Sequence, residues 1–238
     1  NSTLSSIDGN AEFIKSQSGY ADYYINYGWF GTLEDIDNVS MYKLRMGNDD
    51  AIAYRGDVIN VNDVLLSASL GWNWIGYVPQ VSLGVGVALV NIPAGNAEFI
   101  KSQSGYADYY LNYGWFGTLD TMYPLKGYLL RMSNDTDFTY NLGGMARISS
   151  TVDATYNEFD LNIHDYEHNA TMTSALYIDN NRVDSYDYIL SAYNGSACVG
   201  YTEGLYFPLD GNIVFPLMVY GNEAGNTLTF KVYDKSNQ

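Results

Sequence analysis

The chain has little cysteine, histidine and positive charge, and each shortage excludes a class of protein. Only Cys198 is present among 238 residues, so no intrachain disulfide is available to stabilise the fold. Lys and Arg number 11 against 27 Asp and Glu, which gives a formal net charge of −16. Because phosphate contacts require Lys or Arg, we expect no nucleic-acid partner. No long apolar run occurs, and we therefore expect no membrane span.

The residues of common catalytic sites are also scarce. Cys198 lies in the apolar sequence Ala-Cys-Val, which is typical of a buried strand position rather than of a nucleophile. The two histidines, His164 and His168, share the segment HDYEHNA, which we expect to be a loop. No Gly-x-Ser-x-Gly motif or phosphate loop occurs, and no carboxylate pair stands out for a glycosidase. The sequence therefore predicts no catalytic residue and a protein that is not an enzyme.

What the chain does contain is a segment that occurs twice. Asn10–Leu33 reads NAEFIKSQSGYADYYINYGWFGTL, and Asn96–Leu119 repeats it with Leu111 in place of Ile25. Repeated modules are common in binding and building proteins, where repetition adds avidity or reach, and repeated catalytic sites are rare. Either the duplication is recent or its exposed face is in use. The repeat favours a non-catalytic role.

The 24 tyrosines and the other strand-forming residues predict a mainly β protein. We expect two tandem β-rich repeat modules, each with one short helix, followed by a β-sandwich. The first module would cover residues 1–56 and lack its N-terminal strand. The second would cover residues 57–142 and begin with a linker strand, and the sandwich would cover residues 146–238 after a linker at Gly143-Gly144.

One repeat unit is predicted to contain a strand (GWNWIGY), a short helix, three strands (EFIKSQ, GYADYYxNYG and WFGTL), a turn and a strand (YLLRM). In the second copy Pro124 and Gly127 bracket the turn; the first copy lacks both and should turn more loosely. Short alternating runs indicate the sandwich, and Pro216 indicates an edge or a bulge. The expected sandwich strands are Glu158–Ile163, Ala175–Ile178, Tyr186–Ala192, Gly204–Pro208, Ile213–Tyr220 and Thr227–Tyr233.

The motifs GWNWIGYVPQ, IKSQSGYA, GWFGTL and PLKGYLLRM resemble a repeat of large secreted, multimodular proteins of environmental bacteria. Asp187–Gly200, followed by FKVYD at Phe230–Asp234, resembles a β-sandwich module from the C-terminal parts of such proteins. In that pattern an arginine follows the cysteine, a position held here by Val199. The resemblance covers most of the chain and implies export to the cell surface and a non-catalytic role. The start at Asn1 without Met is interpreted as removal of a leader.

The aromatic residues of the repeat are the main candidates for assembly or ligand contact. On a strand, Tyr20, Asp22 and Tyr24 share one face and Tyr23 lies on the other, so one face can be exposed. Exposed rings suit a protein interface or a sugar, whereas buried rings would simply form the core of a small module. The candidates are Tyr20, Tyr23, Tyr24, Tyr27, Trp29, Tyr106, Tyr109, Tyr110, Tyr113 and Trp115.

Two further kinds of site are suggested by short patterns. Asp179, Asp184 and Asp187 are candidate calcium ligands, although the same segment is equally a hairpin turn in a solvated loop. Asn-x-Ser/Thr sequons mark candidate glycan positions if the organism glycosylates. They lie at Asn1, Asn38, Asn134, Asn169 and Asn194.

Together these features predict a secreted structural or adhesive protein that assembles with itself into a fibre or a surface layer. The alternative is a carbohydrate-binding protein that uses exposed Tyr and Trp. Because the first module lacks the GWNWIGY strand, its sheet should expose unpaired backbone groups. We expect a neighbouring subunit to complete it, with intrachain completion by the linker or a frayed module as alternatives. The candidate donor strands are Asn1–Ser6, Asp57–Leu66 and Thr227–Gln238.

Overall fold

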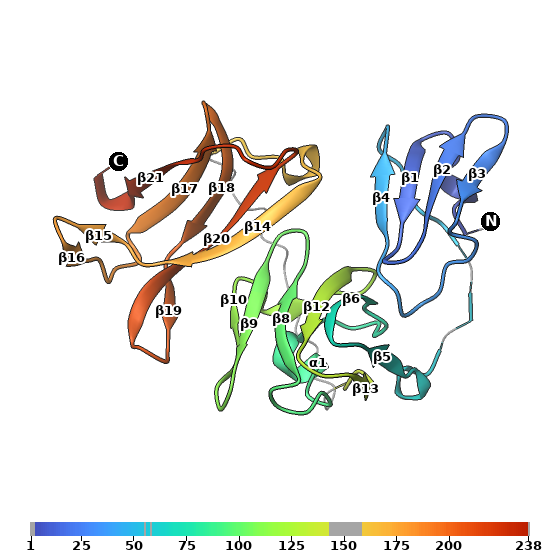
Figure 1. Ribbon diagram of the computed structural model, residues 1–238, viewed down its shortest axis with the longest axis horizontal. Helices are drawn as coiled ribbons and strands as arrows, with labels where there is room; N and C mark the ends of the chain where they lie inside the picture. Colours follow the sequence, from blue (N-terminus) through green and yellow to red (C-terminus); the bar gives the residue numbers. More distant parts are fainter. Residues whose placement is uncertain (1–2, 55, 58, 143–158, 238) are drawn as a thin grey trace. The chain divides into compact units, whose positions relative to one another are not determined.

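The computed structural model describes residues 3–237 except 55, 58 and 143–158 (Figure 1). The described chain is mainly β, with antiparallel sheets and one short α-helix, as the sequence predicts. The chain forms two compact units. The first contains the described residues of 1–102 and 121–149, and the second contains those of 103–120 and 150–238. The predicted division into three modules, with its linker at residues 143–144 outside the described residues, stays a prediction.

The first copy of the repeat folds into a four-stranded antiparallel sheet with the order β3-β2-β1-β4. The prediction of a single strand over GYADYYINYG is wrong, because β2 ends at Tyr24 and residues 25–27 turn the chain, with Asn26 at φ 71°. Asparagine tolerates this left-handed conformation better than most residues. The strands are β1 (Ala11–Lys15), β2 (Tyr20–Tyr24), β3 (Gly28–Gly31) and β4 (Lys43–Met46).

The core of the first copy lies on the face of this sheet that carries Ile14 and Ala21. The segment before β1 forms a 3-10 turn, η1 (Ser5–Ile7), and Ile7 is completely buried against the sheet. The remaining buried members of this cluster are Leu4 and Ala11. Since side chains alternate across a strand, the opposite face of β2 is left for Tyr20 and Tyr24.

Part of the second copy belongs to the same unit. Its strand β12 pairs with β8 on one side and β6 on the other. The predicted short helix is α1 (Val85–Ala88), which lasts for only four residues. The strands here are β5 (Leu66–Ala68), β6 (Gly71–Gly76), β7 (Leu83–Gly84), β8 (Ala97–Lys101), β11 (Thr121–Met122), β12 (Gly127–Met132) and β13 (Thr136–Phe138), with β7 paired to β11 and β5 to β13.

Three tyrosines form the centre of this region. The Tyr77 ring lies 5.2 Å from Tyr140 and 6.3 Å from Tyr128, both edge to face. The Tyr140 hydroxyl donates a hydrogen bond of 2.8 Å to the carbonyl of Gly76. Burial raises the pKa of all three phenols, so they are neutral core members.

The prediction of a linker strand at the start of the second module is wrong for the described residues. The chain instead forms a 3-10 turn, η2 (Val61–Asp63), and the described residues between β4 and Leu66 contain no strand. The Asn60 side chain accepts the backbone N–H of Asn62, which favours the turn over an extended backbone.

Instead of the linker, strand β6 of the second copy contacts the first copy. The Met41 N–H donates to the Trp74 carbonyl (3.1 Å), and the Gly76 N–H donates to the Val39 carbonyl (2.7 Å). The Gln17 side chain donates to the Trp72 carbonyl and accepts the Trp74 N–H. The backbone contacts stop before β4, where only Lys43 reaches β6, with its ammonium 5.2 Å from the centre of the Trp74 ring. β4 therefore remains an edge strand of its sheet.

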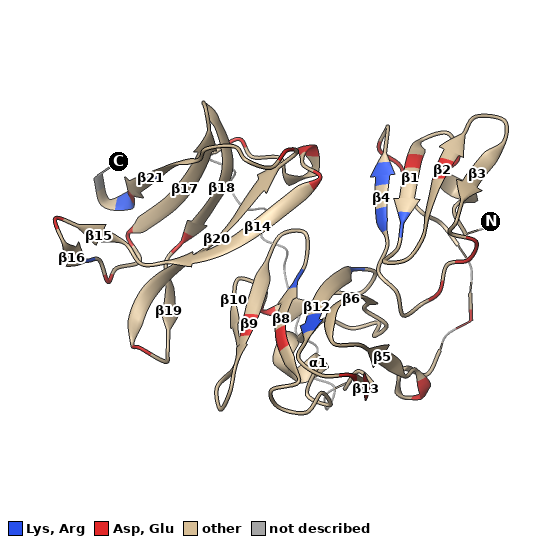
Figure 2. Cartoon of the chain, in the orientation of Figure 1, with Lys and Arg blue, Asp and Glu red and all other residues tan. Residues whose placement is uncertain are grey.

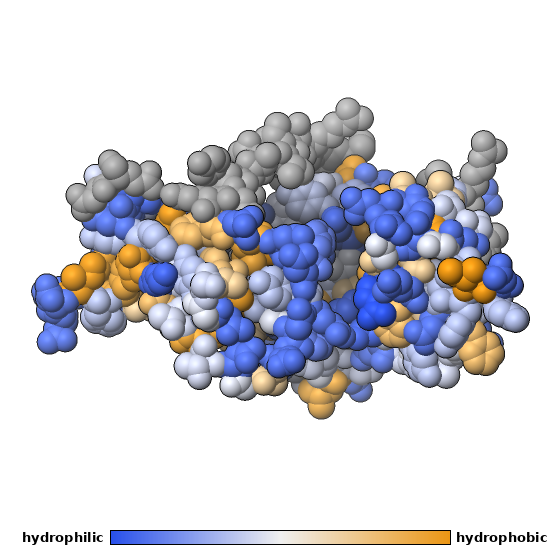
Figure 3. All heavy atoms as spheres, turned by 90° about the horizontal axis from the view of Figure 1, so that it is seen from above, coloured by the Kyte–Doolittle hydropathy of each residue, from blue (hydrophilic) through white to orange (hydrophobic). Residues whose placement is uncertain are grey.

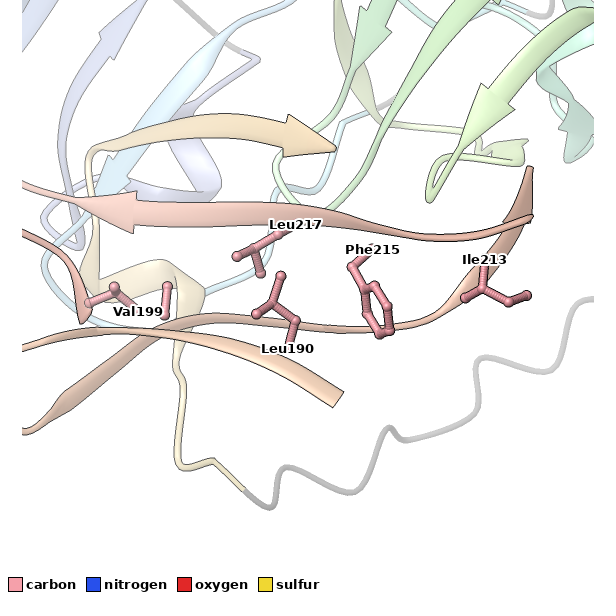
Figure 4. Close-up of a cluster of buried hydrophobic side chains, with 6 residues drawn as sticks. Leu190, Val199, Ile213, Phe215 and Leu217 are labelled. Atoms are coloured by element: carbon pink, nitrogen blue, oxygen red, sulfur yellow. The ribbon is translucent and has the colours of Figure 1, made fainter. Parts of the chain in front are cut away.

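The C-terminal part consists of two three-stranded antiparallel sheets, ordered β14-β20-β19 and β18-β17-β21. Figure 4 shows Ile213, Phe215 and Leu217 of β20 facing Leu190 and Val199 of the other sheet, as in a β-sandwich. The strands are β14 (His168–Ser174), β17 (Tyr188–Asn194), β18 (Ala197–Glu203), β19 (Leu205–Phe207), β20 (Asn212–Gly221) and β21 (Thr229–Asp234), with a small hairpin of β15 (Tyr177–Ile178) and β16 (Asn181–Arg182).

Several strand predictions here need correction. The described residues of Glu158–Ile163 form no strand and lead into a 3-10 turn, η3 (Ile163–Asp165), where Asn162 accepts the N–H of His164. His168 does not lie in a loop but begins β14. Pro216 pairs with β14 at Thr173, beyond the end of β19, so it has a strand partner on one side only, as the edge prediction requires.

An exposed ion pair is repeated in the two copies. Arg45 on β4 contacts Glu12 on β1 at 2.8 Å, and Arg131 on β12 contacts Glu98 on β8 at 3.1 Å. Figure 2 shows the corresponding blue and red segments on β4 beside β1 and on β12 beside β8. The same charges therefore cross the same strand pair in each copy.

Candidate functional site: the two tyrosine faces

The repeated hairpin places four side chains on one of its faces. Tyr20, Asp22 and Tyr24 alternate along β2, and Phe30 on β3 lies opposite Asp22. The counterparts are on β9 (Tyr106–Tyr110) and β10 (Gly114–Gly117), where Phe116 lies opposite Asp108. We call Tyr20, Asp22, Tyr24 and Phe30 the first tyrosine face. Its second-copy equivalent, Tyr106, Asp108, Tyr110 and Phe116, is the second tyrosine face.

Both hairpins have the same backbone geometry. Asn26 and Asn112 have φ values of 71° and 69°, and a glycine with positive φ follows two residues later in each copy. At Gly117 a Cβ atom would overlap the carbonyl oxygen of Tyr106, and the equivalent overlap occurs at Gly31. The two hairpins therefore present their faces from the same kind of turn and the same close strand pairing.

The first tyrosine face is open to solvent. Tyr20 is 49% exposed, Tyr24 52% and Phe30 76%. Tyr27, at the tip of the same hairpin, is 89% exposed. Aromatic rings of this size dominate binding energies when they are buried at an interface, so this exposed group is a candidate contact surface.

The second tyrosine face is covered by the C-terminal sandwich, which belongs to the same unit. Tyr106 is only 2% exposed. Its hydroxyl donates to the Met172 carbonyl at 2.9 Å and lies 2.8 Å from the Thr173 hydroxyl. Both partners are on β14, so this strand satisfies the buried phenol completely.

An aromatic contact extends this docking to β19. The Phe207 ring lies 5.2 Å from Tyr110 and 4.9 Å from Phe116, in edge and tilted arrangements. Such pairs add about 0.5–1.5 kcal/mol beyond the burial of their area. A further hydrogen bond joins the Tyr220 hydroxyl to the Gln103 carbonyl at 3.1 Å. The sandwich therefore contacts the hairpin at two separated points and the segment before β9 at a third.

Burial changes the acid–base behaviour of the covered face. It raises the pKa of Tyr106 to about 12, against a smaller opposing effect of the hydrogen bond with Thr173. It also raises the pKa of the Asp108 carboxyl. Since desolvation disfavours the charged form, docking costs free energy wherever Asp108 is ionised.

The other predicted aromatic residues lie away from these faces or at their rim. Tyr23 packs edge to face on Trp29 at 5.3 Å, and Tyr109 packs on Trp115 at the same distance. Tyr23 lies on the side of β2 that carries the core residue Ala21, and is half-buried. Tyr113 is 45% exposed at the tip of the second hairpin.

Sequence reasoning missed Phe30 and Phe116, and it missed the surface that binds the second face. One signal was present but was interpreted differently: Ile213–Tyr220, counted above among the alternating runs, is apolar throughout, which indicates a strand buried on both faces. The structure shows this, because Val214, Met218 and Tyr220 are buried on the face of β20 opposite the sandwich core.

The remaining candidates stay predictions. No three metal-ligating side chains converge in the described part of the chain. Asp184 accepts the Ile213 N–H, Asp187 accepts the Ser185 hydroxyl, and Asp179 lies in the β15–β16 turn. Among the sequons, Asn38, Asn134 and Asn194 are exposed, and Asn169 is half-buried on β14; Asn1 lies outside the described residues. Cys198 is buried on β18, as predicted, and burial raises the pKa of its thiol.

No protein-family model, curated protein or solved structure matches this chain. None of the helices in the described residues has the length and hydrophobicity needed to cross a membrane.

Proposed function

We propose that this is a non-catalytic, secreted structural or adhesive protein whose copies assemble into a fibre or surface layer. The observation that carries the proposal is the incomplete sheet of the first copy. Its last strand, β4, corresponds to β12 of the second copy, and β12 is flanked by β6. An edge strand offers backbone N–H and C=O groups to another chain.

Strand β21 is the donor that we favour among the candidates. It is the last strand of the sheet β18-β17-β21, and its side chains Phe230, Val232 and Tyr233 are 45%, 40% and 38% exposed. Pairing β21 of one copy with β4 of the next uses two different surfaces. Such a heterologous contact propagates into a filament unless its rotation happens to close a ring.

The surface composition supports assembly through defined edges. Figure 3 shows hydrophobic residues on the viewed face as patches separated by hydrophilic residues. Lys43 and Arg45 on β4 add positive charge to the acceptor strand in a chain of net charge −16. Charged side chains on an edge strand reduce unspecific pairing, so a matching donor is needed.

Val232→Lys tests the donor strand. The variant places a like charge near Lys43 and Arg45 and should abolish polymers in electron microscopy. Because Val232 lies opposite the core residue Leu190 on β17, cooperative thermal unfolding is measured to check that the monomer still folds. Val81→Lys is the matched control, because Val81 is 44% exposed and lies in a bend outside any strand. Polymers of the Val232 variant equal to those of wild type would exclude β21. A wild-type protein that stays monomeric at high concentration would contradict the proposed function itself.

A carbohydrate-binding role is the second candidate, and the open aromatic group of the first hairpin favours it. Tyr24, Tyr27 and Phe30 are all more than half exposed. Planar rings provide an apolar platform for the face of a sugar. Polysaccharide pull-down with wild type and with Tyr27→Ala/Phe30→Ala tests this role: retention that is lost in the variant would support it.

A further inference from the structure

The two tyrosine faces carry the same side chains, but the first is exposed to solvent and the second is covered. Their copies differ only at Ile25 and Leu111. These two residues are 73% and 64% exposed at the hairpin tips, outside both faces. The first tyrosine face therefore offers the same four side chains to a surface that binds the second.

The surface that binds the second face is defined by three groups, which we call the acceptor surface. The Met172 carbonyl and the Thr173 hydroxyl bind a tyrosine hydroxyl, and the Phe207 ring receives two aromatic rings. Docking there leaves Tyr106 almost without solvent exposure, whereas half of Tyr20 remains exposed. The contacts made by the covered face thus indicate which groups a partner of the open face would present.

The numbers of faces and acceptor surfaces are unequal. The described residues carry two tyrosine faces and one acceptor surface. If two copies of the chain exchanged hairpins, each acceptor surface would still hold one hairpin and no more. Among the described residues, acceptor surfaces of this kind can therefore cover only one of the two faces of each copy.

We propose that the first tyrosine face binds a β-sandwich module that is carried by a different polypeptide and presents an acceptor surface of the same kind. Tyr20 would donate its hydroxyl to a strand carbonyl beside a hydroxyl side chain. Tyr24 and Phe30 would pack around one aromatic ring. This contact is separate from the β4 edge, so it goes beyond the assembly proposed above.

The second hairpin and the sandwich belong to one chain, and this covalent link disfavours binding of the first tyrosine face to the sandwich of a neighbouring copy. A covalently linked hairpin has an effective concentration on the order of 1 mM. At a protein concentration of about 10 µM, an identical free hairpin competes at a disadvantage of about 100-fold. The acceptor surface of each copy therefore stays occupied by its own second hairpin.

The test uses two full-length chains. In the acceptor chain, Tyr106→Ser and Phe116→Ser release its acceptor surface, and Tyr20→Ser and Phe30→Ser stop its own first hairpin from refilling it. The donor is otherwise wild type, and both chains also carry Val232→Lys so that filament formation through β4 does not obscure the complex. Analytical ultracentrifugation should show a one-to-one complex whose dissociation constant is at least about 100-fold lower than that of wild-type self-association.

The control donor carries Tyr20→Ser and Phe30→Ser and should not bind, whereas an Ile25→Leu donor should bind like wild type. An acceptor chain that unfolds cooperatively in circular dichroism but does not bind wild type overturns the proposal. So does retention of wild type on a polysaccharide, lost in the control donor, without binding to the acceptor chain.

If the four substitutions prevent folding, a milder acceptor replaces them. Tyr106→Phe and Phe116→Leu keep the bulk of the second face, combined with the same two changes in the first. This chain should bind wild type at least about tenfold more tightly than wild type binds itself, because the tethered competitor is weakened. Equal affinities would overturn the proposal. Filament formation through β4 is scored separately with the Val232 variant, so failure of one proposal is distinguishable from failure of the other.

Discussion

The two tyrosine faces share sequence and hairpin geometry but differ in what surrounds them. Tyr20 is 49% exposed and Tyr106 only 2%. The upstream glutamine changes partners in the same way. Gln17 binds the backbone of β6, whereas the carbonyl of Gln103 accepts from Tyr220 and its side chain contacts His164. Burial is therefore decided by the neighbouring element and not by the local sequence.

The largest difference between the copies should appear on removing the first ring of each face. Tyr106→Ala removes a buried aromatic ring with its hydrogen bonds and should reduce the free energy of unfolding by about 3–5 kcal/mol. Tyr20→Ala should cost less than about 1 kcal/mol, because the ring is half exposed. Urea unfolding measures both. Equal losses would show that the second face is not docked.

The glycines that hold the hairpins should affect both copies alike. Gly31→Ala and Gly117→Ala each bring a Cβ atom onto a backbone oxygen of the neighbouring strand. We expect each to cost about 1–3 kcal/mol, the usual cost of overpacking. Thermal unfolding checks this, and tolerance in only one copy would mean that the two hairpins differ in backbone geometry.

Replacing Asp108, the acidic residue of the covered face, should change the free energy of unfolding by a smaller amount and in the opposite direction. The pKa of Asp108 is raised by burial from 3.8, so its contribution is fully present below that value and is lost as pH rises through the raised pKa. Asp108→Asn should therefore increase the stability at neutral pH, and the gain should disappear in acid. Asp22→Asn, on the open face, is the matched control, and chemical denaturation at several pH values tests the pair.

The smallest effects should come from the repeated ion pairs. Glu12→Gln and Glu98→Gln each remove an exposed pair and should cost less than about 1 kcal/mol, and less again in high salt. Similar small values in the two copies are expected in urea titrations. A large loss at Glu98 alone would reveal a second difference between the copies.

Much of the fold follows from local patterns. The alternation in the repeat predicted its strands, and Pro124 and Gly127 predicted the turn before β12, which the structure confirms. The turn at Asn26 was missed because tyrosines continue on both sides of it, and these favour a strand. Strand β14 was missed because HNATMTS has few apolar residues and is stabilised by pairing with β20.

The candidate site was harder to predict, since its definition depends on distant contacts. The aromatic residues of the hairpin were identified, but Tyr23 was placed among the contact candidates and Phe30 was left out. Strand register explains this: Phe30 lies on β3 opposite Asp22, and the face was inferred from β2 alone. To predict which copy is covered, one would have to know that Phe207 contacts the second face, and Phe207 is 91 residues beyond Phe116.

The most direct test of the account compares solvent access at Tyr20 and Tyr106 without changing either ring appreciably. 3-Fluorotyrosine is placed at one of the two positions in separate full-length proteins, and ¹⁹F NMR is recorded with a soluble paramagnetic agent. We predict strong broadening of the signal at position 20 and little at position 106. Equal broadening at the two positions would contradict the claim that one tyrosine face is covered and the other is free to bind.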